Sequence, residues 1–185
     1  ISGADSVCEY DAAVGYATTL AAGNSYLWTV TGGTLVSGQG THAITVDWGM
    51  AGAGMVEVLE TIDATGCQAS ASFNVVISPL PAPAISGADN VCEYDAAVSY
   101  ATTLVAGNSY QWTVTGGTIA GGQGTHAITV DWGMAGTGTV EVLETVTATG
   151  CEASASFNVV ISPLPAPAIS GADSVCEYDA AVGYA

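Results

Sequence analysis

The chain has 185 residues, and its 17 Asp and Glu residues are opposed by no Lys or Arg, which gives a formal net charge of −17 at pH 7. The absence of cationic side chains excludes binding to nucleic-acid phosphates and argues against most chemistry on phosphate or carboxylate substrates. Only 9% of the residues are charged and 49% are hydrophobic, so the chain can bury a core and is expected to fold.

The dominant feature of the sequence is a repeat of 84 residues. Residues 1–84 align with residues 85–168, and 12 of these 84 positions differ, which leaves 72 identical. Residues 169–185 begin a third copy that stops short, so we interpret the chain as a window of a longer array. A period of this length is too long for a solenoid unit and suits a small domain with its own core. We therefore predict two domains, 1–84 and 85–168, followed by the truncated start of a third in 169–185.

Short runs of alternating apolar residues fill each repeat, and Gly, Asn, Asp or Ser interrupts them about every 8 to 12 residues, without any helical period. Side chains alternate between the two faces of a strand, so every second residue of such a run should face the core. The pattern predicts an all-β sandwich in which the variable position Leu27 faces water. In the first repeat the runs are 25–31, 43–48, 56–58 and 72–77, and the predicted inward residues are Tyr26, Trp28, Val30, Ile44, Val46, Trp48, Phe73, Val75 and Ile77.

Proline occupies every second position at the end of each full repeat, in residues 79–83 and again in residues 163–167. Proline fixes φ and removes amide donors, which favours a stiff, extended connector. We interpret both segments as linkers between domains. Short stiff linkers should hold consecutive domains nearly end to end, so the array is expected to be a rod.

Cysteines occur twice in each full repeat and once in the third copy, at Cys8, Cys67, Cys92, Cys151 and Cys176. This pattern predicts disulfides that form in an oxidising compartment. Pairing within a repeat, as Cys8–Cys67 and Cys92–Cys151, is the simplest arrangement. The turns that carry the two cysteines should lie at opposite ends of a sandwich, however, and the end of one domain abuts the start of the next. A bond across the joint, Cys8–Cys151, is therefore an equal alternative, and the sequence leaves both open.

Acidic residues gather beside the first cysteine of each repeat, at Asp5, Glu9, Asp11, Asp89, Glu93 and Asp95. Carboxylates that lie close together near a domain junction could hold Ca²⁺, which would stiffen the rod. A solvated acidic turn is the simpler interpretation, because no EF-hand loop is present. The single histidines, His42 and His126, have no second ligand at metal-binding spacing and are expected on the surface of a strand. The tryptophans are expected to anchor the core rather than to form a sugar-binding platform: Trp28, Trp48, Trp112 and Trp132.

The elements ISGADSVCEYDAAVGY, NSYLWTVTGGT, GQGTHAITVDWG, ATGC and VVISPLPAP follow one another in the first repeat, and Y-x-W-T-V-x-G-G, I-T-V-x-W-G and G-C recur in both repeats. This pattern resembles the PKD-like, immunoglobulin-like repeats of very large cell-surface proteins of Bacteroidota, of which gliding-motility adhesins are the best-known carriers. The resemblance implies a seven-stranded β-sandwich, export from the cell and a role as a spacer or adhesive stalk. Asp-Ser-Val at Ser6 and at Ser174 is similar to the O-glycosylation sequence of the same bacteria.

We therefore expect tandem immunoglobulin-like sandwiches in a rod, as a structural part of an extracellular adhesin or filament at a bacterial cell surface, with no enzyme activity and no catalytic residue. The expected partners are neighbouring repeats of the same chain and identical chains in a filament, and neither nucleic acid nor an inserted membrane segment is expected. In the alternative hypothesis, each repeat of a secreted protein binds glycan or Ca²⁺ multivalently. Because no cations pair with the carboxylates, isolated repeats should stay monomeric at low ionic strength.

Overall fold

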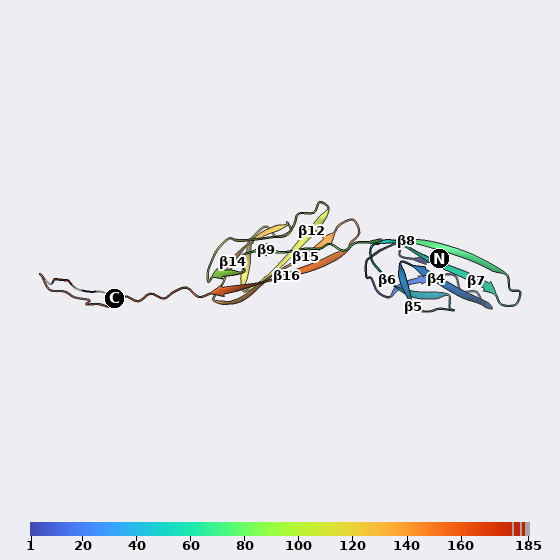
Figure 1. Ribbon diagram of the computed structural model, residues 1–185, viewed down its shortest axis with the longest axis horizontal. Coiled ribbons are helices and arrows are strands. Elements are labelled where there is room, and N and C mark those ends of the chain that lie inside the picture. The colour runs from blue at the N-terminus through green and yellow to red at the C-terminus, as the bar shows by residue number, and fades with distance from the viewer. Residues whose placement is uncertain (179, 182, 184–185) are drawn as a thin grey trace.

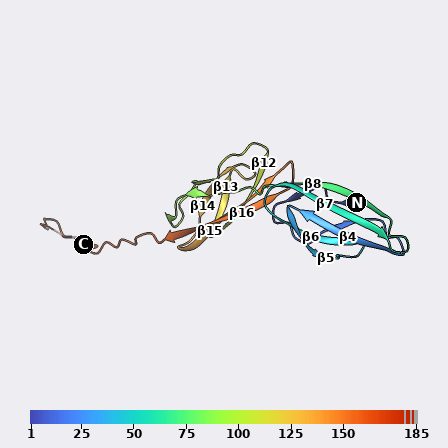
Figure 2. The same cartoon turned by 45° about the vertical axis from the view of Figure 1, so that its right-hand side comes forward.

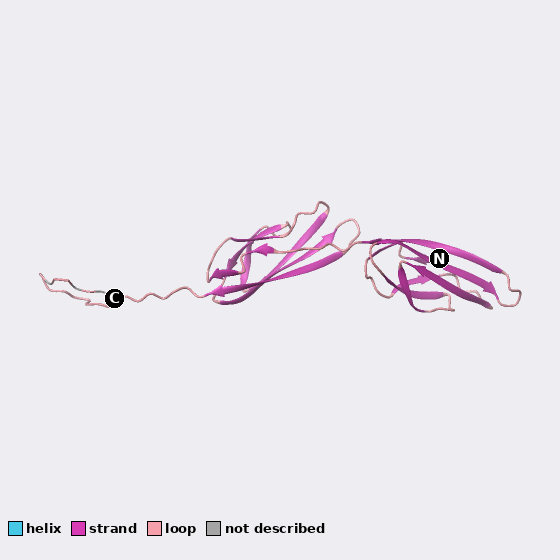
Figure 3. Ribbon diagram, in the orientation of Figure 1, coloured by secondary structure: helices cyan, strands magenta, loops and turns pink. Residues whose placement is uncertain are grey.

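Strands and turns make up the whole of the described chain, which comprises residues 1–178, 180–181 and 183 of this computed structural model (Figure 3). The prediction of an all-β fold is confirmed. The strands of the first repeat are β1 (Ser2–Gly3), β2 (Ser6–Cys8), β3 (Val14–Ala17), β4 (Asn24–Thr31), β5 (Gly33–Ser37), β6 (Ala43–Trp48), β7 (Gly52–Ile62) and β8 (Gln68–Ser78). Those of the second are β9 (Ser86–Gly87), β10 (Asn90–Cys92), β11 (Val98–Ala101), β12 (Asn108–Thr115), β13 (Gly117–Gly121), β14 (Ala127–Trp132), β15 (Gly136–Val146) and β16 (Glu152–Ser162).

Each repeat is a sandwich of two four-stranded sheets. In the first repeat the strand orders are β1-β3-β6-β5 and β2-β8-β7-β4, and the second repeat has the same topology in β9 to β16. Within the described part of residues 169–185 there is no strand. The two sandwiches follow one another along the long axis of the molecule, and both views show this extended arrangement (Figures 1 and 2).

The sandwich has eight strands among the described residues of each repeat, where the family resemblance implied seven, because the first strand is divided. β1 pairs antiparallel with β3 in one sheet, whereas β2 pairs parallel with β8 in the other. The chain crosses between the sheets at Ala4 and Asp5. The hydroxyl of Tyr16 donates to the carbonyl oxygen of Ala4 at 2.9 Å, and the Val76 amide donates to the carbonyl oxygen of Asp5 at 2.8 Å. Both carbonyls of the crossing are thus satisfied.

The core lies between the two sheets and contains seven of the nine residues that the alternation predicts, whereas Val30 and Phe73 are only partly buried. Four buried residues were not among those predicted to face inward: Val7, Tyr16, Val56 and Val58. Trp28 and Trp48 are each 3% exposed, and Leu27, between inward neighbours, is 56% exposed. All four tryptophans are buried, which confirms their predicted place in the core. Trp48 stands edge-on to Tyr16, with ring centroids 5.8 Å apart and an interplanar angle of 82°. Burial raises the pKa of the Tyr16 phenol above its ordinary value, and the negative charge of Asp5 acts in the same direction.

Two separate clusters of buried side chains form, one in each repeat. The first contains buried residues from Val7 to Ile77 and the second contains their counterparts from Val91 to Ile161. No buried residue belongs to both clusters, so each repeat encloses its own core.

A glutamine side chain covers the edge of β4. Gln39 accepts a hydrogen bond from the Trp28 amide through Oε1 and donates through Nε2 to the Trp28 carbonyl oxygen, both at 2.9 Å. Its amide therefore imitates a neighbouring strand at the point where β4 has none, and Gln123 does the same for Trp112. Paired backbone groups at a sheet edge are unavailable for association with another chain.

Replacement of this glutamine should destabilise the repeat that carries it. Gln39→Ala leaves the amide and carbonyl of Trp28 without their partners, and we expect a loss of about 1–3 kcal/mol in the free energy of unfolding. Urea unfolding followed by tryptophan fluorescence measures this loss. Gln39→Glu is the matched control, because it keeps an acceptor for the Trp28 amide but has no donor for the carbonyl. Full stability in Gln39→Ala would contradict the assigned role.

Candidate functional site at the joint between the repeats

The two cysteines of the first repeat lie beside opposite ends of β8. β2 runs parallel to the end of β8, and Cys8 is in register with Ser78, the last residue of β8. Cys67 directly precedes the first residue of β8. An 11-residue strand separates the two cysteines by about 35 Å, far beyond the Cα–Cα distance of about 4.4–6.8 Å that a disulfide needs. The pairings within a repeat, Cys8–Cys67 and Cys92–Cys151, are therefore not formed.

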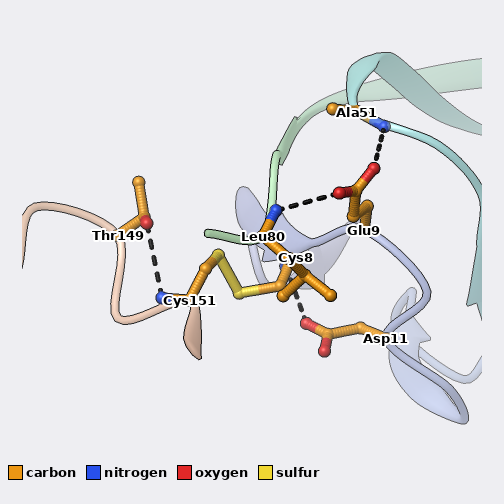
Figure 4. Close-up of a disulfide and its surroundings, with 7 residues drawn as sticks. All are labelled: Cys8, Glu9, Asp11, Ala51, Leu80, Thr149 and Cys151. Carbon is orange, nitrogen blue, oxygen red and sulfur yellow. Dashed lines mark hydrogen bonds between the residues drawn. A yellow bond between two sulfur atoms is a disulfide. The ribbon is translucent and has the colours of Figure 1, made fainter. Parts of the chain in front are cut away.

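The disulfide crosses the joint instead. Cys8 of the first repeat is bonded to Cys151 of the second, with an S–S distance of 2.02 Å and a Cα–Cα distance of 5.6 Å (Figure 4). The bond joins residues that are 143 positions apart in sequence. Of the two arrangements that the sequence left open, the structure contains the one that links neighbouring domains. Cys67 and Cys92 are exposed free thiols.

The turn between β15 and β16 presents Cys151 to the first repeat. The amides of Thr149 and Gly150 both donate to the Val146 carbonyl oxygen, at 3.2 and 2.8 Å, and the Val146 amide donates to the Cys151 carbonyl oxygen at 2.8 Å. Gly150 has a φ of 75°, a left-handed conformation that favours glycine. This geometry explains the sequence Ala-Thr-Gly-Cys, which recurs at the same place in the first repeat.

Glu9 holds the beginning of the linker. Its Oε1 accepts a hydrogen bond from the Leu80 amide at 2.9 Å and its Oε2 accepts one from the Ala51 amide at 3.2 Å (Figure 4). The carboxylate thereby ties the linker to the turn between β6 and β7, next to the disulfide. Glu93 makes the same two contacts, with Leu164 and Ala135.

Asp11 holds the loop that follows Cys8. Its Oδ2 accepts a hydrogen bond from the Cys8 amide at 2.8 Å, and the Trp48 amide donates to its carbonyl oxygen at 2.8 Å. Tyr10 and Ala13 have positive φ values of 66° and 54°, which are uncommon for residues other than glycine. Asp47 accepts a bond from the Ala13 amide at 2.7 Å. Carboxylates therefore fix a strained loop directly beneath the disulfide.

These contacts give several of the proposed calcium ligands another role. Glu9, Asp11, Glu93 and Asp95 all accept hydrogen bonds from backbone amides. The carbonyl oxygens of Asp5 and Asp89 accept bonds from the last strand of their repeats. No group of three His, Cys, Asp or Glu side chains within the described residues is arranged to hold a metal ion. Calcium binding at the joint stays a prediction.

The joint buries surfaces that are open at the outer ends of the two repeats. Leu80, Pro81 and Pro83 are half-buried in the joint, whereas the corresponding residues of the second linker are exposed. Ala84 donates its amide hydrogen to Thr102 Oγ1 at 3.3 Å, which ties the end of the linker to the second repeat. The linker is thus fastened at both ends, as well as stiffened by its prolines.

The predicted O-glycosylation sites and the two histidines remain to be placed. Ser6 is exposed in β2, and Ser174 is exposed outside any strand, so O-glycosylation at both stays a prediction. His42 and His126 directly precede β6 and β14 and are half-buried, so the expectation that they lie on the surface of a strand is wrong. Their carbonyl oxygens accept hydrogen bonds from the amides of Thr18 and Thr102. The described chain contains no helix that is long and apolar enough to span a membrane.

Sequence reasoning missed the roles of Glu9 in the linker contact and of Thr102 in receiving the linker. Glu9 and Leu80 are 71 positions apart, and no local pattern connects them. The signal that was available is the identity of the two repeats at these positions, together with the place of Glu9 beside the cysteine of the joint.

Comparison with known proteins identifies the family. The PKD-like domain matches residues 1–75 and again residues 78–159. No curated protein sequence matches the chain. Among solved structures, the fibronectin(III)-like modules of Clostridium thermocellum CbhA are similar with a TM-score of 0.40 and 11% identity, over 87% of this chain and 90% of that one.

Two further structures have similar scores. Drosophila N-cadherin EC1-4 has a TM-score of 0.39 and 11% identity, over 89% of this chain and 48% of that one. Yersinia pseudotuberculosis InvD has a TM-score of 0.33 and 16% identity, over 96% of this chain and 63% of that one. The family match rests on the sequence itself and spans both repeats almost completely. The chain therefore belongs to the PKD-like domain family and carries two such domains in tandem.

Proposed function

We propose that this chain is a stiff spacer that resists force in the stalk of a bacterial surface adhesin or in an extracellular filament. The observation that carries the proposal is the disulfide Cys8–Cys151, which fastens one domain covalently to the next. A disulfide within a domain would stabilise that domain alone. A disulfide across a joint acts on the angle between domains, and that angle decides whether an array is a rod.

The contacts around the disulfide support the same role. The joint has two independent connections, since the disulfide and the linker are separate covalent paths between the sandwiches. The linker is held by Glu9 at its start and by Thr102 at its end. Two connections that are not collinear restrict bending and twisting more than one flexible tether does.

The proposed location is outside the cell and attached to its surface. Disulfides persist in oxidising environments and are rare in the reducing cytosol. A spacer of this kind needs no catalytic group, and its function depends on length and resistance to force. The chain, with 17 Asp and Glu residues and no Lys or Arg, also offers trypsin-like proteases no cleavage site.

Solution scattering of the oxidised protein tests the proposal. Two strands of 11 residues placed end to end with a proline linker between them span roughly 90 Å, and we expect a rod of at least this length. The variant Cys8→Ser/Cys151→Ser should keep both sandwiches but show a broader distribution of distances between them. A compact globule for the oxidised protein, or identical distributions for the two proteins, would reject the spacer role.

A further inference from the structure

Two covalent connections cross the joint, and they attach to different strands. The linker leaves the end of β8 and enters β9 and β10 of the second repeat. The disulfide leaves Cys8 at the end of β2 and enters β16 through Cys151, which directly precedes that strand. The last strand of one repeat is thus continued by the first strands of the next, and the first strands are continued by the last strand.

The first and last strands of a repeat also lie side by side. β2 pairs in parallel with the end of β8, where Cys8 is opposite Ser78, and β10 pairs in the same way with β16. Val7 in β2 and Val91 in β10 are each 6% exposed and belong to the two cores. The two strands therefore run through their repeat in the same direction and are fastened to the same sandwich.

The segment that joins the last strand to the next repeat has little slack. Residues 67–92 begin immediately before β8, pass through the proline linker and end with β10. Fully extended, this segment spans about 90 Å. Two 11-residue strands with the linker between them already span roughly that length. A pull along the rod therefore meets a segment that is already nearly extended.

The residues that build the joint occur in both repeats. They comprise both cysteines, Glu9 with its counterpart Glu93, and Thr102 with its counterpart in the first repeat, and none of the 12 positions that differ between the repeats is among them. In a longer array, the preceding repeat would therefore attach at Cys67 and the following repeat at Cys92.

We propose that the array contains two continuous covalent cables, which run side by side through every repeat. In the array of the proposed spacer, on which this proposal rests, every joint carries the disulfide seen between Cys8 and Cys151. One cable passes through the last strand of a repeat, the linker and the first strands of the next repeat, and then crosses a disulfide to the last strand of the third. The second cable follows the same course one repeat out of step.

The remaining residues of each repeat connect the two cables. Residues 9–66 and 93–150, which we call the bodies, lie between the two cysteines of their repeat and contain most of the sandwich. Each body joins one cable at its first cysteine and the other cable at its second. Because two covalent paths cross every joint, no single broken disulfide or peptide bond separates the array. A pull on both cables leaves every body unloaded.

Each disulfide forms by oxidation of two thiols, and a small-molecule disulfide such as oxidised glutathione is the oxidant. One cysteine thiolate attacks this disulfide, which gives a mixed disulfide and releases one thiol. The second cysteine thiolate then attacks the mixed disulfide and releases another thiol. The two cysteines lose two protons and two electrons, and the small disulfide is reduced to two thiols.

Force spectroscopy on chains with different numbers of repeats tests the two cables. Chains of three and four repeats are made by joining copies of residues 1–84, each of which encloses its own core. They are oxidised with glutathione disulfide and pulled by their ends. The first repeat carries Cys67→Ser and the last repeat carries the change equivalent to Cys92→Ser, because these two cysteines have no neighbouring repeat to pair with.

The number of repeats decides the expected result. With four repeats both ends belong to the same cable, so we expect no unfolding step before the chain reaches full length. With three repeats the ends belong to different cables, so one body must unfold, in a single step of roughly 200–250 Å. In reductant, each chain should give one step per repeat, which shows that every repeat is folded. Any step in the oxidised four-repeat chain, or any number other than one in the three-repeat chain, would overturn the proposal.

Removal of single disulfides from the four-repeat chain assigns each bond to a cable. Replacement of both cysteines by serine at the middle joint breaks the cable that holds neither end, and we expect no step. The same replacement at the first joint breaks the cable that holds both ends. Tension must then pass through two bodies, in two steps that together release about 500 Å. Equal behaviour of these two matched variants would contradict the alternation of the cables.

The spacer role has a separate readout. It depends on the rod shape of the two-repeat chain in solution scattering, which needs only the disulfide between Cys8 and Cys151. A rod-shaped chain whose four-repeat form unfolds in steps would reject the two cables and leave the spacer role standing. A two-repeat chain that is not a rod would reject the spacer role itself.

Discussion

Pulled by its two ends, the oxidised protein should extend by about 500 Å less than the reduced protein before it reaches full length. The disulfide joins residues 143 positions apart, and a fully extended chain spans at most about 3.6 Å per residue. Force applied at the termini passes from Cys8 directly to Cys151, so the residues between them carry no load. Force spectroscopy on single molecules, with and without reductant, measures this difference.

The strands outside the segment that the disulfide closes, residues 8–151, should add little extension. In the oxidised protein the load passes through β1 and β2, crosses the disulfide and continues through β16 and the second linker. These segments are already extended, so their detachment from neighbouring strands lengthens the molecule only slightly. An array with a disulfide at every joint would repeat this path and would resist stretching until a covalent bond broke.

Two matched variants isolate the cause. Cys8→Ser/Cys151→Ser should release the full length without reductant, because force then reaches both sandwiches. Cys67→Ser/Cys92→Ser keeps the joint disulfide and should behave like the oxidised parent protein. If the oxidised parent protein extended as far as the first variant, the disulfide would not carry the load.

The alternation of apolar residues predicted most of the core, but it did not identify Val7 and Tyr16, which lie in short strands. Tyr26, Trp28, Ile44, Val46 and Trp48 are buried as expected, because a strand with one face against a second sheet must place every second side chain inward. The predicted run 43–48 coincides with β6, whereas the runs 56–58 and 72–77 were much shorter than β7 and β8. β7 and β8 each have 11 residues, since their polar ends continue the pairing beyond the apolar centre that the pattern detects.

The divided first strand and the choice of disulfide could not be derived from local patterns. β1 and β2 have two and three residues, too few for an alternation to be recognised. The choice between Cys8–Cys67 and Cys8–Cys151 depends on the parallel pairing of β2 with the end of β8, which puts Cys8 beside the linker. That pairing is a contact between distant parts of the sequence. The cysteine spacing is compatible with both alternatives.

Truncation of one core tryptophan should unfold one repeat and leave the other folded. The Trp48 ring is 3% exposed, packs edge-on against Tyr16 and lies against the backbone of Gly54, where an added Cβ would be 2.5 Å from the ring. Trp48→Ala would leave a cavity between these residues, at a cost of about 3–5 kcal/mol. A small domain has roughly 5–15 kcal/mol of stability in total, so the first repeat becomes marginal.

Calorimetry should then show two transitions in Trp48→Ala, with the lower one shifted by more than about 10 °C. The fluorescence of Trp28, which this variant retains, reports on unfolding of the first repeat. Trp132→Ala is the matched control and should shift the transition of the second repeat instead. This outcome follows from the separation of the two buried clusters, which share no side chain. A single transition that moved as a whole would mean that the joint couples the domains into one cooperative unit. The rod would then derive its stiffness from shared folding energy rather than from a covalent bond between independent domains.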